Sequence, residues 1–137
     1  MNLLLVDKSA YEVRARSEEA RTALSELLAA GGVISMCEVI SLELLYSARN
    51  SSDYERLRTE HTKLTWLPTT NAALQRAIDI QHQLAHKGQH RRAIPDLLIA
   101  ATAEEHEATV VHYDKDFDLI AEVTGQPTRW VVPAGTC

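Results

Sequence analysis

Short runs of apolar residues alternate along the chain with longer segments in which apolar residues recur every three or four positions. Uninterrupted apolar runs of four or five residues are typical of strands that are covered on both faces of a sheet. Such runs predict five strands, at residues 3–6, 33–36, 65–68, 109–113 and 128–132.

The segments between these runs have the periodicity of amphipathic helices. Ser17 followed by Glu18 and Glu19 is a typical start of a helix, and the pair Gly31 and Gly32 predicts its end. A cap is expected at Ser51 or Ser52 for a later helix. We predict helices at residues 11–16, 17–30, 39–49, 52–64, 70–87, 96–107 and 115–123, with a loop at 88–95.

Strands that alternate with helices predict an α/β fold with a mostly parallel sheet. The 137 residues suit a single domain, 1–137. In sheets of this kind ligands bind at the carboxyl ends of the strands. Charged residues at those ends are therefore the first candidates for a functional site.

Acidic residues stand at such positions. Asp7 follows the first predicted strand, Asp114 follows the fourth, and Asp116 lies two residues further on. Asp96 follows a proline at the start of a helix, and Glu43 lies inside an otherwise apolar helix that we expect to be largely buried. A buried carboxylate is costly unless it is paired or binds a cation.

Each acid taken alone has an ordinary structural interpretation. Asp96 could be a helix N-cap, Asp7 or Asp114 could start a turn, and Glu43 could pair with Arg49 or a lysine. Taken together, the acids favour one pocket in which cations offset their mutual repulsion. Carboxylate oxygens select hard ions such as Mg²⁺ or Mn²⁺.

The composition narrows the class of protein. The net charge of −5 argues against binding nucleic acid by bulk charge alone, although a metal site with a local basic patch is compatible with it. No apolar run is long enough for a membrane helix, and the start of the chain does not resemble a signal peptide. Two cysteines do not make a disulfide framework, so we expect a cytoplasmic protein without membrane contact.

Four segments that contain these acids resemble the motifs of a known family. The segments "LLVDKSA", "ISLELLYSAR", "IPDLLIAATA" and "VVHYDKDFDLIAEVTG" are similar, in order and spacing, to the motifs of PIN-domain ribonucleases, particularly the VapC toxins of mycobacterial toxin–antitoxin pairs. The resemblance covers the whole chain. It implies a three-layer α/β/α fold with a parallel sheet of about five strands. It also implies an endoribonuclease that uses Mg²⁺, for which Mn²⁺ may substitute.

The resemblance also assigns site residues. It implies that Asp7, Glu43, Asp96 and Asp114 are catalytic, and that Asp7, Asp96, Asp114 and Asp116 bind metal. We expect metal-assisted hydrolysis of an RNA phosphodiester, with Glu43 binding through a water or orienting the attacking water. The number of metal ions and the RNA that is cut stay open.

Other residues in or beside the motifs are candidates for supporting roles. Ser9 matches a small hydroxyl residue of the family, and we expect it to hydrogen-bond a carboxylate or a substrate phosphate. Lys8 stands where many members have a small residue, and it could pair with an acid or hold a phosphate. Arg91 and Arg92 are candidates for phosphate contact, against the alternative of a solvated loop. His112 is expected to be structural.

Several other functions compete with this interpretation. A non-catalytic PIN-like module that binds RNA or protein would keep the fold without the chemistry. An aspartate phosphatase would have a second acid at the place of Ser9, and a phospho-receiver domain would have a paired acid in the first motif. The resemblance further implies a homodimer and a VapB-type antitoxin as partners.

Overall fold

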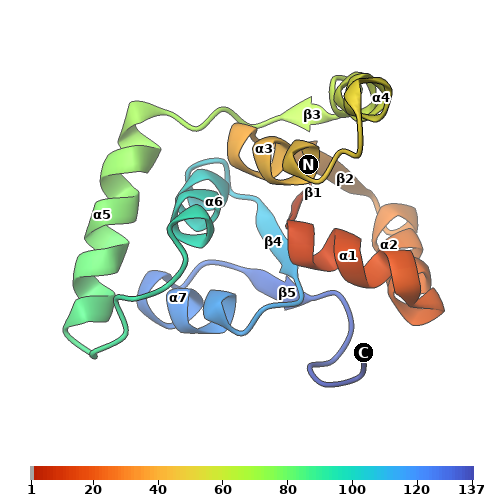
Figure 1. The fold of residues 1–137 in the computed structure, drawn as a ribbon. Coiled ribbons are helices and arrows are strands. Elements are labelled where there is room, and N and C mark those ends of the chain that lie inside the picture. The colour runs from red at the N-terminus through yellow and green to blue at the C-terminus, as the bar shows by residue number, and fades with distance from the viewer. Residues whose placement is uncertain (1) are drawn as a thin grey trace.

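The computed structural model describes residues 2–137. Five parallel strands form one sheet in the order β3-β2-β1-β4-β5 (Figure 1). The strands are β1 (Asn2–Val6), β2 (Gly32–Met36), β3 (Thr65–Trp66), β4 (Thr109–His112) and β5 (Thr128–Trp130). The central strand β1 pairs with β2 on one side and with β4 on the other. The strand order therefore reverses at β1, and the carboxyl ends of β1 and β4 lie side by side.

Helices cover both faces of the sheet (Figure 1). The helices are α1 (Lys8–Arg16), α2 (Glu18–Ala29), α3 (Glu38–Tyr46), α4 (Ser51–His61), α5 (Asn71–Ala85), α6 (Ile94–Glu105) and α7 (Asp116–Thr124). Helices α1 and α2 lie on one face, whereas α3, α5, α6 and α7 lie on the other. The predicted three-layer α/β/α fold is confirmed.

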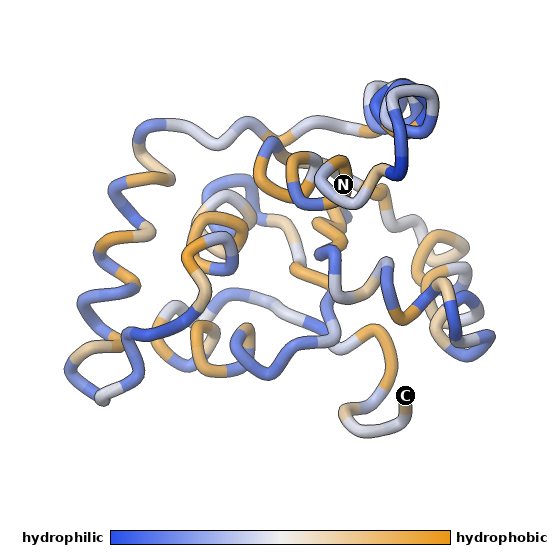
Figure 2. The backbone as a smooth tube through the Cα atoms, in the orientation of Figure 1, coloured by the Kyte–Doolittle hydropathy of each residue, from blue (hydrophilic) through white to orange (hydrophobic). Residues whose placement is uncertain are grey.

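Successive side chains of β1 point to opposite faces and enter two separate cores. Leu4 and Val6 pack with α1 and α2, whereas Leu5 belongs to the larger core under α3, α5, α6 and α7. Figure 2 shows the hydrophobic positions along β1 and along α6 and α7, whereas α4 is largely hydrophilic. Within residues 2–137, no helix has both the length and the apolar character needed to cross a membrane.

The turn from α2 into β2 depends on two adjacent glycines, as the sequence predicts. Gly31 has a φ of 98°, a left-handed conformation that favours glycine. A Cβ on Gly32 would lie only 2.7 Å from the carbonyl oxygen of Leu27 and 2.6 Å from Cδ1 of Leu4. Gly32 therefore lets the end of α2 pack directly against the sheet.

One predicted helix cap was wrong. The N-cap of α4 is Asn50, whose side-chain oxygen accepts a hydrogen bond from the backbone N–H of Asp53 at 2.8 Å. Ser51 and Ser52 instead lie in the first turn of the helix. Asparagine, serine and aspartate are all good caps, so a run of such residues does not reveal which one takes that position.

Candidate active site

Asp7 ends β1 and caps the next helix. Its Oδ2 accepts hydrogen bonds from the backbone N–H of Ser9 at 3.0 Å and from the Ser9 hydroxyl at 2.6 Å. This cap lets α1 begin at Lys8, earlier than the predicted start at Tyr11. The carboxyl group is 4% exposed, and its Oδ1 is buried without a hydrogen-bond partner. One oxygen of Asp7 is therefore fixed by the chain, and the other is left for a ligand.

Ser9 joins the ends of the two adjacent strands. Its hydroxyl donates to Asp7 and accepts a hydrogen bond from the backbone N–H of Tyr113 at 2.8 Å. The backbone N–H of Asp7 also donates to the carbonyl of Val111 at 2.9 Å, which fixes β1 against β4. Of the two roles predicted for Ser9, the structure has the hydrogen bond to a carboxylate. The single hydroxyl proton is used in that bond.

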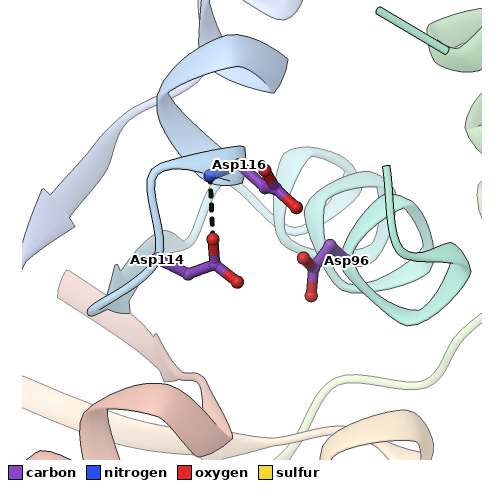
Figure 3. A group of neighbouring side chains, drawn as sticks. All are labelled: Asp96, Asp114 and Asp116. Carbon is purple, nitrogen blue, oxygen red and sulfur yellow. Dashed lines mark hydrogen bonds between the residues drawn. The ribbon is translucent and has the colours of Figure 1, made fainter. Parts of the chain in front are cut away.

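Asp114 and Asp116 are fixed to each other in the turn from β4 into α7. Oδ1 of Asp114 accepts a hydrogen bond from the backbone N–H of Asp116 at 2.9 Å (Figure 3). The backbone N–H of Asp114 donates to Nδ1 of His112 at 3.1 Å. Burial lowers the pKa of His112 to about 4, so the ring is neutral at pH 7 and can accept this bond. The expected structural role of His112 agrees with its complete burial.

Asp96 lies within the first turn of α6 rather than at its cap. The helix begins at Ile94, the cap position belongs to Ala93, and Pro95 occupies the first turn, where its missing N–H costs nothing. Asp96 is 7% exposed, and its Oδ2 is buried without a hydrogen-bond partner. The interpretation of Asp96 as a plain N-cap is therefore wrong.

The side chains of Asp96, Asp114 and Asp116 point toward one another (Figure 3). Each offers one carboxylate oxygen, and these oxygens all lie within 4.8 Å of one another. Burial raises the pKa of Asp96 to about 8, and the negative charges of Asp7, Asp114, Asp116 and Glu43 add to the effect. We call Asp96, Asp114 and Asp116 the acidic triad.

Asp7 lies beside the acidic triad, although its oxygens are not part of that close group. Its charge contributes to the raised pKa of Asp96, second after burial. The pKa of Asp7 is itself raised, because the cost of burial exceeds the stabilising effect of its hydrogen bonds. The sequence predicts four acids around a metal ion. One carboxylate oxygen from each of three of them lies within 4.8 Å of the others, and Asp7 lies next to this group, fixed by Ser9.

Glu43 reaches the same region from α3. Burial raises its pKa, and the charge of Asp7 raises it further. The expectation that α3 is largely buried was wrong, because Leu42 is 65% exposed and Tyr46 is 89% exposed. The alternative in which Glu43 pairs with Arg49 was also wrong, since Nε of Arg49 lies 3.8 Å from the Asp53 carboxylate. Glu43 thus stands at the border between the acids and an open apolar surface.

Lys8 does not pair with the acidic triad. Its Nζ lies 3.4 Å from the carboxylate of Glu12, one helical turn further along α1. Lys8 also lines a shallow pocket of about 290 Å³ with Leu42, Glu43 and Tyr46. The side chain of Lys8 therefore lies at the rim of the acidic site, beside Glu43.

The two arginines of the loop before α6 differ in their contacts. Nη1 of Arg92 lies 2.8 Å from Oδ1 of Asp116, and its Nε donates to the carbonyl of Gln89 at 3.2 Å. Arg91 is exposed. The sequence suggests both residues as phosphate contacts but gives no sign of the ion pair, because Arg92 and Asp116 are far apart along the chain.

The comparisons with known proteins agree with this geometry. Residues 5–123 match the PIN domain family. The chain is 49% identical over 111 residues to Ribonuclease VapC51 of Mycobacterium tuberculosis, covering 81% of each chain. It is 44% identical over 134 residues to Ribonuclease VapC18 of the same organism, covering 96% of each chain. The chain belongs to the VapC family of PIN-domain proteins.

Solved structures share the fold of this VapC protein. VapBC-1 from nontypeable Haemophilus influenzae matches with a TM-score of 0.74 at 18% identity, covering 96% of this chain and 98% of that chain. At this identity the likeness establishes the fold alone. The resemblance to VapC proteins suggested by the sequence motifs is confirmed.

Replacing Ser9 with alanine is expected to lower the stability of this VapC protein by about 1–3 kcal/mol. The substitution removes the donor to Asp7 and leaves the backbone N–H of Tyr113 without its acceptor. Urea unfolding followed by circular dichroism measures the loss. Ser9→Thr keeps the hydroxyl and should retain most of the stability. An unfolding free energy for Ser9→Ala equal to that of the wild type would contradict this role.

Proposed function

We propose that this protein is a Mg²⁺-dependent endoribonuclease, acting as the toxin of a type II toxin–antitoxin pair. The observation that carries the proposal is the pair of buried oxygens without partners, Asp7 Oδ1 and Asp96 Oδ2, beside Asp114 and Asp116. Burying several carboxylates together is unfavourable unless a cation compensates them. The site therefore has the charge and the free oxygens that a divalent cation requires.

The donor set fits Mg²⁺, and Mn²⁺ as its substitute. The candidate ligands are carboxylate oxygens from Asp96, Asp114 and Asp116, with Asp7 next to them. Hard divalent ions prefer such oxygens, whereas zinc sites usually include sulfur or nitrogen. When bound, a divalent cation would supply positive charge that activates water and offsets the charge of the phosphodiester.

The chain's own residues would then position the reactants. Ser9 fixes the orientation of Asp7 and ties it to β4, so both strand ends present their acids in one direction. Glu43, whose pKa is raised by burial and by the charge of Asp7, would bind through a water or orient the attacking water. His112 stays neutral and holds the backbone of Asp114. Arg91 is exposed and free to contact a phosphate of the RNA.

The substrate and partners follow from the relatives. The relatives with the highest identity reported above are named ribonucleases, which supports RNA as the substrate. The fold is also similar to that of VapBC-5 from Mycobacterium tuberculosis, which is described as a member of the VapBC family of toxin–antitoxin systems. This supports a VapB-type antitoxin as a partner. We also propose a homodimer and a cytoplasmic location.

Cleavage of a total RNA pool tests the proposal. The protein, freed of any copurified partner, is incubated with RNA in Mg²⁺ and in EDTA, beside Asp7→Asn and Asp79→Asn. Asparagine at position 7 keeps an oxygen that can accept from Ser9, and Asp79 is an exposed acid on α5 that serves as a control. We expect discrete Mg²⁺-dependent products from the wild type and Asp79→Asn only. No products from the folded wild type would favour the non-catalytic PIN-like module.

A further inference from the structure

The guanidinium group of Arg92 contacts the acidic triad. Nη1 of Arg92 lies 2.8 Å from Oδ1 of Asp116, and the two side chains are 22% and 21% exposed. This is a partly buried, charge-assisted hydrogen bond, stronger than the usual ion pair on a protein surface. Asp116 is one of the three residues whose oxygens converge on the candidate cation site. The carboxylate of Asp116 is therefore both the partner of Arg92 and a candidate ligand of the cation.

We propose that Arg92 is an intramolecular competitor of the divalent cation, neutralising Asp116 in the cation-free protein and leaving it when the cation binds. The inference rests on the proposed function, because it concerns the regulation of that site. A positive charge in contact with a ligand carboxylate opposes the arrival of a second positive charge. By linkage, cation binding must weaken the Arg92–Asp116 pair by the same factor.

The segments of both partners have hydrogen bonds that do not involve the ion pair. The backbone N–H of Asp116 is held by Oδ1 of Asp114, which fixes the start of α7. The loop before α6 is held by the backbone N–H of Gln89, which donates to the carbonyl of Leu84 at 2.9 Å. These bonds would remain if the pair opened, which is what a competitor requires.

A released Arg92 would stay close to the site. Its Nε donates to the carbonyl of Gln89, a contact that does not involve Asp116. The guanidinium would then be free at the rim of the acids, where an RNA phosphate has to approach carboxylates. Arginine suits this role because its fork of donors matches a phosphate. The same residue would balance charge without the cation and would hold the substrate with it.

The affinity of the RNA-free protein for Mg²⁺ tests the competition. Isothermal titration calorimetry compares the wild type with Arg92→Gln and with Arg91→Gln. The control removes the same charge from the same loop, but from an exposed side chain. We expect Arg92→Gln to bind Mg²⁺ roughly tenfold more tightly than Arg91→Gln does. Equal affinities of the two variants would overturn the inference, and weaker binding by Arg92→Gln would show that Arg92 orients Asp116 instead.

A second pair of variants separates competition from a general structural effect. In the Asp116→Asn background, Arg92→Gln should change Mg²⁺ affinity no more than Arg91→Gln does, because the shared carboxylate is gone. A tightening that persists in this background would overturn the inference. In RNA cleavage at saturating Mg²⁺, Arg92→Gln should raise KM more than it lowers kcat, as expected for a lost phosphate contact.

The measurements also distinguish this inference from the proposed function. A wild type that binds Mg²⁺ and cleaves RNA, with no tightening in Arg92→Gln, would keep the proposed function and reject the competitor. A folded wild type that neither binds Mg²⁺ nor cleaves RNA would reject both. Tighter binding in Arg92→Gln together with a raised KM would support both.

Discussion

Replacing Asp96 with asparagine is expected to abolish RNA cleavage while making the cation-free protein more stable. Asp96 is 7% exposed, it has an oxygen without a partner, and it faces Asp114 and Asp116. Asparagine has nearly the same shape but no charge, so the substitution removes a ligand and the repulsion together. Its amide N–H groups can also donate to the neighbouring carboxylates, which the aspartate cannot do when ionised.

The two effects should be large. Cleavage should fall by at least about a hundredfold, because a proposed ligand of the cation is lost. The cation-free protein should gain about 2 kcal/mol in unfolding free energy near pH 7.5, a discounted conversion of the raised pKa of Asp96. Addition of Mg²⁺ should then raise the melting temperature of the wild type but not that of the variant.

Cleavage assays and thermal unfolding in EDTA and in Mg²⁺ measure both effects on the same samples. Asp79→Asn, which removes an exposed acid from α5, is the matched control and should behave like the wild type. A less stable Asp96→Asn protein in EDTA would contradict the prediction, because it would mean that other groups of the protein already stabilise the Asp96 carboxylate. Cleavage by Asp96→Asn at the wild-type rate would show that Asp96 is not needed for catalysis.

The stability of the cation-free protein is expected to fall as the pH rises from about 6.5 to about 8. The pKa of Asp96 is raised to about 8 by burial and neighbouring charges, from an ordinary value of 3.8. Between these two values the folded state holds more protons than the unfolded state, so stability decreases with increasing pH. The loss should reach up to about 2 kcal/mol over this range.

Histidine 112 explains why the decline should become clear only above pH 6.5. Burial lowers the pKa of His112 from 6.5 to about 4, so the unfolded state holds more protons between these values and stability rises with pH. This rise opposes the effect of Asp96 at lower pH. Above pH 6.5, the ordinary histidine pKa, His112 no longer changes the stability, and only the destabilising effect of Asp96 remains.

Urea unfolding at several pH values, in EDTA and in saturating Mg²⁺, tests the pH dependence. In Mg²⁺ the decline should disappear, because the cation favours the ionised triad and its apparent affinity rises as protons leave. Asp96→Asn in EDTA should also show little decline. A wild-type stability that rises from pH 6.5 to 8 in EDTA would mean that Asp96 is ionised throughout this range.

The strands and the placement of the acids could be predicted because both depend on local sequence. Short apolar runs bounded by polar residues favour strands buried on both faces of a sheet, and an acid directly after such a run lies at its carboxyl end. Asp7 and Asp114 were placed correctly for this reason. That β1 and β4 are neighbours, and so bring these acids to one edge, is known only from the strand order of the structure.

The contacts that refine the site could not be predicted, because they join residues far apart in the chain. Nothing near Ser9 indicates that its hydroxyl accepts from Tyr113, and nothing near Arg92 indicates Asp116. The exposure of Leu42 and Tyr46 was missed for a similar reason. An apolar helix normally implies a covered helix, and only the assembled layers show which side of α3 has no neighbour among residues 2–137.

The strand order also has a consequence for the protein during its synthesis. Asp7 directly follows β1, whereas the neighbouring strand β4 and the helix that carries Asp116 come much later along the described residues. Most of the polypeptide must therefore emerge before the acids can meet. A nascent chain that stalls before β4 cannot bring Asp7 together with Asp114 and Asp116, which follow that strand.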